Sequence, residues 1–407
     1  MTTPDHQRPR VLVSTDIGGT DPDDFQSMVH LLLYADVLDL EGLLSSPYGE
    51  GRAADIHRVI DCYEHDFDQL RRHAHYPQPD ALRALVKQGA IDRADHHGRT
   101  GTTEGSDWIV QRARAEDERV LDVLVWGGLD DVAQALHEAP DIADHLRVHY
   151  IGGPNTMWSV NAYRYLEAHH PTLAMIESNS TYRGFFEPDR DDPRPVDNEA
   201  FVREHVAGHG ALGDFFAAQL PQVKMGDSPT LTWLLHGDRV PDSPSWGGRF
   251  VPLWADRRRH FTRLTTAADQ VEVNAVLELT LPLPEGYGAS DRTHLLVDGR
   301  EQGPCPDGVA QAGSITFALS VYRLGEVPYR VRSTHPGLDG LEGAFTSVLP
   351  TPEKAAAASP EHPRWWTDDP DPAQAIGPAL GARWVSRYRS EFLGDFARRL
   401  QRCLPGS

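Results

Sequence analysis

The 407-residue chain has little cysteine and no long apolar run. Its three cysteines, Cys62, Cys305 and Cys403, lie far apart and follow no metal-binding spacing. Neither a disulfide framework nor a cysteine-based metal site is therefore expected. No stretch has enough consecutive apolar residues to span a bilayer, and the first ten residues contain no signal-peptide core. These features predict a cytoplasmic location.

The chain also has a deficit of positive charge. It contains 60 acidic against 39 basic residues, which gives a formal net charge of -21, and no block rich in Lys or Arg stands out. Such a surface repels nucleic-acid backbones and anionic membranes. We therefore expect neither a nucleic-acid nor a membrane partner, while the composition leaves a homo-oligomer open.

The glycine-containing stretch 16–24 lacks the features of a phosphate-binding loop. No Gly-Lys-Ser/Thr follows it, and it contains no Gly-x-Gly-x-x-Gly. It lies between an apolar run at 11–13 and an apolar pattern at helical spacing that begins at Phe25, which predicts strand, loop and helix. Carboxylates at the end of a strand repel one another unless a cation or protons intervene. The direct chemical interpretation is an oxygen-rich site for a hard divalent cation, formed by Asp16, Asp21, Asp23 and Asp24.

Plainer interpretations of these motifs stay open. The loop can be an ordinary polar turn in which Asp23 and Asp24 favour the positive end of the helix dipole. Adjacent histidines at His96 and His97 could bind a metal ion, but a solvated loop explains them better.

Strand-like and helical segments alternate along the first 250 residues. Apolar strand patterns cover the segments 38–44, 120–126, 146–151 and 172–176. Helical patterns lie between them, which predicts an α/β fold with an open, mostly parallel sheet and helices on both faces. Glu177 and Asn179 flank one residue at a strand end, so both side chains are expected to point into one crevice.

The pattern changes after about residue 256. From 257 to 350 the sequence alternates and is rich in β-branched residues, with turns such as Asp298-Gly299. An Ala/Pro-rich stretch follows, and then one face of a helix, formed by Trp384, Tyr388, Phe392, Phe396 and Leu400. We therefore expect an α/β domain over 1–256 plus 351–407, into which a small antiparallel, sandwich-like β domain is inserted at 257–350.

Residues 13–24, Val-Ser-Thr-Asp-Ile-Gly-Gly-Thr-Asp-Pro-Asp-Asp, resemble the signature of nucleoside hydrolases, Asp-Thr-Asp-Pro-Gly-x-Asp-Asp, with a longer loop. Further loops that resemble those of this family recur in the same order, at 127–131, 152–155, 177–179 and 226–229. The nearer resemblance is to a bacterial branch with a nucleoside-hydrolase-like domain, often labelled cellulose-binding proteins. In that branch a helix similar to residues 392–397 closes the domain.

The resemblance implies a calcium-dependent hydrolase of N-glycosidic bonds that acts on a nucleoside or sugar. The ion would be held by Asp16, Asp24, Asp227 and the backbone carbonyl of Asp130. Asp16 would also act as the general base that activates a metal-bound water. The residues that bind sugar hydroxyls would be Asp23, Asn155, Asn161, Glu177 and Asn179.

One departure from the family pattern keeps a second function open. Gly226 stands where nucleoside hydrolases have a His that assists the departing base, and Asp227 can also be read as a simple helix N-cap. The alternative is a carbohydrate-binding or otherwise non-catalytic protein that uses the acidic pocket and the β insertion for sugar recognition.

Overall fold

The computed structural model of the chain describes residues 8–46, 52–189, 191–192, 195–300 and 306–406. Its main sheet has eight strands in the order β3-β2-β1-β4-β5-β6-β16-β7. Neighbouring strands are parallel except β16 and β7, which are antiparallel. The strands are β1 (Arg10–Thr15), β2 (Asp39–Ser45), β3 (Val86–Gln88), β4 (Leu121–Val125), β5 (Leu146–Ile151), β6 (Ala174–Ser178), β7 (Phe250–Pro252) and β16 (Trp365–Asp368).

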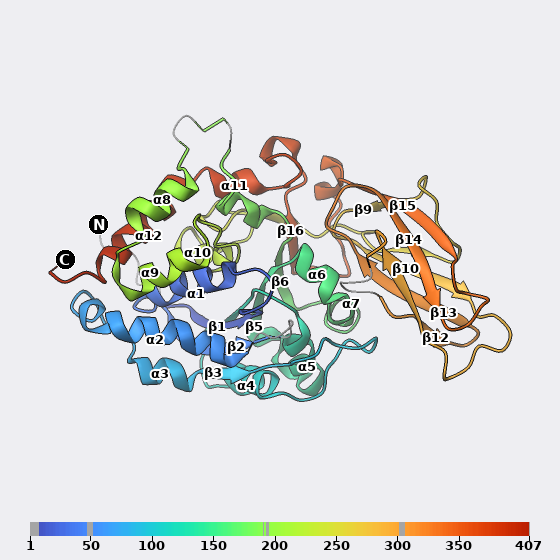
Figure 1. The fold of residues 1–407 in the computed structure, drawn as a ribbon, viewed down its shortest axis with the longest axis horizontal. Helices are drawn as coiled ribbons and strands as arrows, with labels where there is room; N and C mark the ends of the chain where they lie inside the picture. The colour runs from blue at the N-terminus through green and yellow to red at the C-terminus, as the bar shows by residue number, and fades with distance from the viewer. Residues whose placement is uncertain (1–7, 47–51, 190, 193–194, 301–305, 407) are drawn as a thin grey trace.

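Helices cover both faces of this sheet, as the sequence predicts (Figure 1). In β1, Val11 and Val13 belong to one apolar core while Leu12 belongs to another, because alternate side chains of a strand point to opposite faces. The helices are α1 (Asp23–Leu33), α2 (Ala53–Leu70), α3 (Pro79–Ala84), α4 (Glu104–Ala113), α5 (Asp130–Glu138), α6 (Pro154–Trp158), α7 (Val160–His169), α8 (Asn198–His205), α9 (Gly210–Gln219), α10 (Ser228–Leu235), α11 (Ala382–Ser386) and α12 (Arg389–Gln401). The prediction of an α/β fold is confirmed.

The order of the strands places a binding crevice beside β1. From β1 the chain moves outward on one side to β2 and β3, and on the other side to β4, β5 and β6. In parallel sheets, the point where the order reverses leaves a crevice at the carboxyl ends of the two central strands. Here those ends are the loops that follow Thr15 and Val125, so the acidic loop lies at the switch point.

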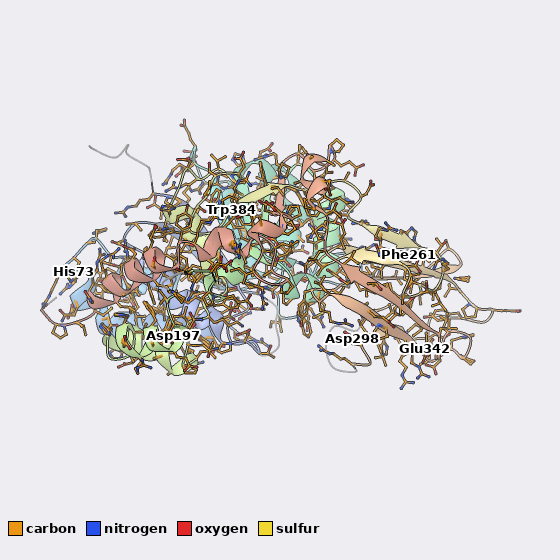
Figure 2. The ribbon with its side chains drawn as sticks, turned by 90° about the horizontal axis from the view of Figure 1, so that it is seen from above. His73, Asp197, Phe261, Asp298, Glu342 and Trp384 are labelled. Atoms are coloured by element: carbon orange, nitrogen blue, oxygen red, sulfur yellow. The ribbon has the colours of Figure 1, made fainter. Side chains whose placement is uncertain are left out.

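The segment between β7 and β16 forms a lobe of two four-stranded sheets, seen to one side of the main sheet in Figure 1. Figure 2 labels Phe261, Asp298 and Glu342 in this lobe. A third apolar core, which includes Leu279, Phe317 and Phe345, lies within it. The strands are β8 (Arg259–Phe261), β9 (Gln270–Glu272), β10 (Val276–Pro282), β11 (Thr293–Val297), β12 (Val309–Gln311), β13 (Ser314–Ser320), β14 (Gly325–Ser333) and β15 (Glu342–Val348).

Two predicted elements are each broken into two. The segment 271–281, part of the alternating region predicted to form the β domain, is divided into β9 and β10 at Asn274, which has a positive φ of 63°. The expected helix from Trp384 is divided into α11 and α12, and the break lets the buried Arg389 donate hydrogen bonds to the carbonyls of Phe185 and Val196. In both places a tertiary contact or turn overrides the local periodicity.

Strand β16 joins the end of the chain to the main sheet. It lies between β6 and β7, and its Trp365 is completely buried. Helix α12 packs on the face that also carries α1, since Phe392 and Phe396 share a core with Met28. Within the described ranges, none of the helices combines the length and apolarity that a membrane crossing requires.

Candidate functional site

An acidic cluster lies where the switch point predicts it. Asp23, Asp24 and Asp227 are buried, and one carboxylate oxygen from each lies within 4.8 Å of the other two. Asp23 and Asp24 begin α1, whereas Asp227 comes directly before α10. The Oδ2 atom of Asp227 is buried and has no hydrogen-bond partner among the residues that the structure describes. A buried carboxylate oxygen without a partner is costly, so this atom marks a position that a cation would satisfy.

Burial and mutual repulsion shape the protonation of this cluster. Burial raises the pKa of Asp23, Asp24 and Asp227 well above the usual range, and the neighbouring carboxylates raise each pKa further. Burial also raises the pKa of Asp16 to about 7, although a hydrogen bond with Asp24 opposes this shift. A carboxyl group with such a pKa can accept and release a proton near neutral pH.

Asp16 lies beside the group of three rather than within it. It follows β1 directly and lines the same cavity as Asp23, Asp24 and Asp227. Its Cβ would be 2.7 Å from a Cβ built on Gly127, so the loop after β4 packs against it. Only a residue without a side chain permits this approach. The assignment of Asp16 as a metal ligand stays a prediction.

A lysine that the sequence analysis missed belongs to the same site. Lys224 forms an ion pair with Asp21, and its Nζ lies 3.6 Å from Asp23 Oδ2. These contacts lower the pKa of Asp21, although burial acts in the opposite direction. Lys224 therefore neutralises part of the negative charge at the outer edge of the cluster. Asp24 and Asp227, deeper in the site, form no ion pair with another described residue.

The cluster opens into a cavity of about 520 Å³ with aromatic walls. Such a volume is in the range of small-molecule sites. Trp126 is held in place because its indole N–H donates to Thr230 Oγ1 at 2.8 Å. The aromatic residues that line the cavity are Trp126, Trp158, Tyr182, Phe186 and Tyr322. Aromatic residues at helical or strand spacing usually belong to a core. Spacing alone therefore did not indicate that these five residues line a cavity.

The predicted sugar-binding residues divide into two groups. Asp23 and Asn155 line the acidic cavity, and Asn155 Nδ2 donates to the carbonyls of Trp126 and Ile151 at 3.1 and 3.0 Å. Asn161 instead donates to the carbonyl of Ala94 at 3.2 Å and lines a different cavity. The structure therefore does not bring Asn161 to the acidic cluster.

Glu177 and Asn179 are also occupied elsewhere. Glu177 is completely buried, forms an ion pair with Arg257, and accepts a hydrogen bond from Tyr163 at 2.8 Å. Asn179 Oδ1 accepts a hydrogen bond from the Gly153 N–H at 3.0 Å. Both side chains are buried and bonded to neighbouring protein groups. Their assignment as sugar-binding residues stays a prediction.

The Asp130 carboxylate is turned into the protein. It accepts hydrogen bonds from the Ala94 N–H at 2.6 Å and from Ser159 Oγ at 2.8 Å. Burial raises its pKa. The sequence analysis assigned calcium binding to the backbone carbonyl of Asp130 and not to this carboxylate. That assignment stays a prediction.

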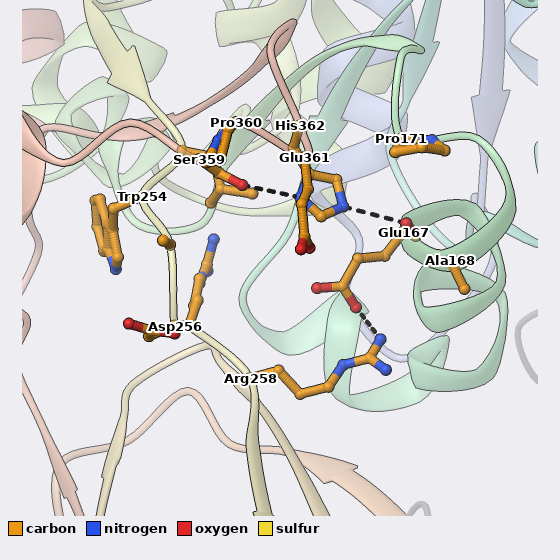
Figure 3. A pocket seen from close by; sticks show the side chains of 13 residues that line it. Glu167, Ala168, Pro171, Trp254, Asp256, Arg258, Ser359, Pro360, Glu361 and His362 are labelled. Atoms are coloured by element: carbon orange, nitrogen blue, oxygen red, sulfur yellow. Dashed lines mark hydrogen bonds and ion pairs between the residues drawn. The ribbon is translucent and has the colours of Figure 1, made fainter.

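A larger cavity, of about 680 Å³, lies at the junction of the main sheet and the β lobe (Figure 3). In this cavity Arg258 forms an ion pair with Glu167, and His362 hydrogen-bonds to Ser359 and to the Glu167 carbonyl. The smaller acidic cavity differs, because Asp24 and Asp227 are buried there and form no ion pair with another described residue.

A second group of metal-type donors is exposed. Oxygen or nitrogen atoms of Asp95, His96 and His97 lie within 4.8 Å of one another. Asp95 Oδ1 accepts the N–H of His97 at 2.8 Å, as an ordinary polar turn does. The solvated-loop interpretation accounts for this arrangement.

Comparison with known proteins finds solved structures that are similar to this chain and one family whose model matches it. Among solved structures, a nucleoside hydrolase-related hypothetical protein from Saccharophagus degradans, associated with carbohydrate metabolism, is 18% identical over 84% of this chain and 99% of that chain, with a TM-score of 0.50. The inosine-uridine preferring nucleoside hydrolase from Bacillus anthracis is 15% identical over 56% of this chain and 81% of that chain, with a TM-score of 0.37. The purine-preferring ribonucleoside hydrolase from Gardnerella vaginalis is 15% identical over 60% and 83%, with a TM-score of 0.37.

None of the curated proteins matches the chain. The model of one family, described as "Cellulose-binding Sde182, nucleoside hydrolase-like domain", matches residues 10–250. That range contains β1 to β6, the acidic loop and Asp227, which means that it includes the whole acidic cluster. The chain belongs to this nucleoside hydrolase-like family.

Proposed function

We propose that this protein is a calcium-dependent hydrolase that cleaves a glycosidic bond of a sugar held in the acidic cavity, most simply an N-glycosidic bond. The observation that carries the proposal is the buried group of Asp23, Asp24 and Asp227, with the unpartnered Oδ2 of Asp227. Such a group is stable at neutral pH only if protons or a cation compensate its charge. The family relationship supports a hydrolase of the nucleoside hydrolase type.

The donor set fits a hard divalent cation. The available atoms are carboxylate oxygens, which Ca²⁺ prefers over nitrogen and sulfur ligands. When bound, a cation would supply attraction for two adjacent sugar hydroxyls and would make a bound water more acidic. Asp24 and Asp227 would hold it, together with Asp23 and with Asp16 from the neighbouring loop. Asp24 is oriented by the hydroxyl of Thr15, which donates to its Oδ1.

In this proposal the chain's own residues bind the sugar and move one proton. Asp16 accepts the proton of the attacking water at its carboxylate, since its raised pKa places it near the working pH. Trp126 and Tyr182 exclude water from the floor of the cavity. The carboxylates around the anomeric carbon favour the positive charge that develops on the sugar ring during cleavage.

A second candidate function is sugar binding without cleavage. Gly226 offers no group that can protonate a leaving group, and the carboxylate of Asp23 occupies the adjacent space. The family description also includes the words "cellulose-binding". In this alternative the acidic cavity and a bound cation would recognise sugar hydroxyls and leave the glycosidic bond intact.

Two measurements on the same preparation test the proposal. Calorimetric titration of chelator-treated protein with CaCl₂ should show one site, which Asp227→Asn abolishes and Asp80→Asn retains. Asp80 is a suitable control because its side chain is 95% exposed. Free ribose or nitrophenol should then appear from nucleosides or from nitrophenyl riboside. Calcium binding without any release favours the second candidate, and a metal-free site contradicts both.

A further inference from the structure

The β lobe contributes a wall to the acidic cavity. Of the residues that line this cavity, Arg300 and Tyr322 come from the lobe, while Asp16 and Asp227 come from the main sheet side. Tyr322 follows β13, and 44% of its surface is exposed. An aromatic side chain that lines a polar cavity and remains open to solvent offers a flat apolar face to a ligand.

A buried chain of contacts holds Tyr322 at the cavity. The carbonyl of Val321 accepts a hydrogen bond from the Asn274 N–H at 2.8 Å. The carbonyl of Asn274 accepts one from Arg257 Nη2 at 3.1 Å, and Arg257 also forms the ion pair with Glu177 at the end of β6. The contacts therefore run from the carboxyl end of the main sheet to the residue next to Tyr322.

The ion pair between Glu177 and Arg257 holds the two segments in one geometry. Glu177 is completely buried and 9% of the Arg257 residue surface is exposed. Separating a buried pair leaves an uncompensated charge, so such pairs hold one geometry even where they add little stability. Glu177 also accepts hydrogen bonds from Tyr163 and Asn179, at 2.8 and 3.1 Å, which help to fix its orientation. The lobe is thus held in one orientation where it meets the cavity.

The chemistry of the wall indicates what it binds. A sugar ring has C–H groups on its faces and hydroxyls on its edge, so it can lie on an aromatic face and still bond to polar groups around it. Because Tyr322 is open to solvent, a ligand that contacts it can continue out of the cavity. The net charge of -21 disfavours acidic polymers and leaves a neutral glycan.

We propose that Tyr322 forms a second sugar subsite, which binds the ring of a neutral oligosaccharide next to the ring held at the acidic cluster. Glu177 and Arg257 are positioning residues that act through Tyr322. This inference rests on the part of the proposed function that places a sugar ring at the acidic cluster, and it holds whether or not the bond is cleaved.

Calorimetry in the presence of CaCl₂ tests the subsite, with cello-, xylo- and mannotetraose and the matching monosaccharides as probes. Tyr322→Ala should weaken binding of the tetraose that the wild type binds by roughly tenfold, the size of a lost ring contact. Tyr322→Phe should bind within about twofold of wild type. Leu324→Ala, an exposed apolar residue two positions on, is the matched control and should leave binding unchanged. Monosaccharide and calcium affinities should be the same in all variants.

A double-mutant cycle tests the positioning role. If Glu177 acts through Tyr322, Glu177→Gln combined with Tyr322→Ala should bind the tetraose no more weakly than the weaker single variant. A purely structural role would give additive losses, and Arg257→Lys provides a second route if Glu177→Gln does not fold. If tetraose affinity is unchanged in Tyr322→Ala but lost in Asp227→Asn, the subsite is overturned and the proposed function stands. Nucleoside binding that depends on Tyr322, or no tetraose binding at all, overturns the sugar assignment.

Discussion

The carboxylate of Asp23 occupies the space that a side chain on Gly226 would need. A Cβ built on Gly226 would lie 2.2 Å from Asp23 Oδ2, and the Gly226 N–H donates to the same oxygen at 3.2 Å. The position where the resembling hydrolases have a His is thus closed by an acidic residue of the cluster. Any substitution at Gly226 must displace Asp23.

Gly226→Ala should therefore impair cation binding. Displacement of Asp23 removes one of the three clustered oxygens, and we expect the calcium dissociation constant to rise about tenfold or more, which corresponds to about 1.4 kcal/mol. Gly394→Ala is the control, because its Cβ would meet only Arg398 Nη1 at 3.7 Å. Calorimetric titration of both variants compares the two. Unchanged affinity in Gly226→Ala would show that Asp23 is no ligand.

Calcium should stabilise the wild type and not Asp227→Asn. Ligand at a hundred times its dissociation constant adds about 2.7 kcal/mol, which raises the melting temperature by a few degrees. Without calcium, the order of the two melting temperatures should be the opposite of that with calcium. Asp227→Asn should then melt higher than the wild type, since it removes a buried carboxylate whose pKa is raised by burial and by Asp24. Melting temperatures of both proteins, measured with calcium and with a chelator, check both predictions. A wild-type melting temperature that neither additive changes argues against a metal site.

Asp16→Asn should lose turnover while it keeps the fold. An amide can ligate through oxygen but cannot accept a proton at neutral pH, so a loss of ~10²–10⁴-fold is expected. Because the base must be deprotonated, wild-type activity should rise with pH. Burial raises the pKa of Asp16 to about 7, and the bound cation should move the rise in activity to a lower pH. Turnover per folded molecule, measured between pH 5 and 8, is the readout. Equal turnover in Asp16→Asn would assign the base to another residue.

Removal of the β lobe and removal of the chain end should have opposite effects. Replacing 257–350 by a short linker should leave a soluble α/β core, whereas ending the chain at 350 should unfold it, because β16 and α12 are then lost from the sheet and from its core. Circular dichroism and melting curves of the two truncated proteins distinguish them. A protein ending at 350 that melts like the full chain would contradict the division into 1–256 plus 351–407 and an inserted 257–350.

His30 should make stability depend on pH. It is buried, its Nδ1 lies 2.9 Å from Ser228 Oγ, and burial lowers its pKa from 6.5 to about 3. The stabilisation is therefore complete above pH 6.5 and is lost as the pH falls toward 3. The loss from pH 7 to pH 5 should be about 2 kcal/mol. Urea unfolding at both values should show a shallower pH dependence for His30→Gln, and parallel curves would refute this.

Local patterns predicted the position of the acidic loop between a strand and a helix. The apolar run before Asp16 and the helical spacing after Asp24 are determined by neighbouring residues, so they placed both carboxylates correctly at the sheet edge. The alternation of strands and helices also predicted the mostly parallel sheet. Asp227 joins the group across the fold, and only the family resemblance indicated it.

Contacts between residues far apart in the chain could not be predicted from the sequence. Glu177 has the position and chemistry of a sugar ligand, but Arg257, 80 residues later, takes its carboxylate. Lys224 and Asp21 form an ion pair across more than 200 residues, and no periodicity marks such a pair. The short strand β16 was hidden because a four-residue segment that begins with two tryptophans has no alternating pattern. Each of these features depends on which surfaces meet after folding.

The position of β16 also determines the order in which the chain can fold as it leaves the ribosome. About 110 residues separate β7 from β16, so at typical synthesis rates the gap between β6 and β7 stays open for roughly 6 to 20 s. The β lobe, whose strands all lie between β7 and β16 in the sequence, is complete first. Until Trp365 emerges, the unpaired edge of β6 is a template for other strands, and nascent chains should need protection by a chaperone at this stage.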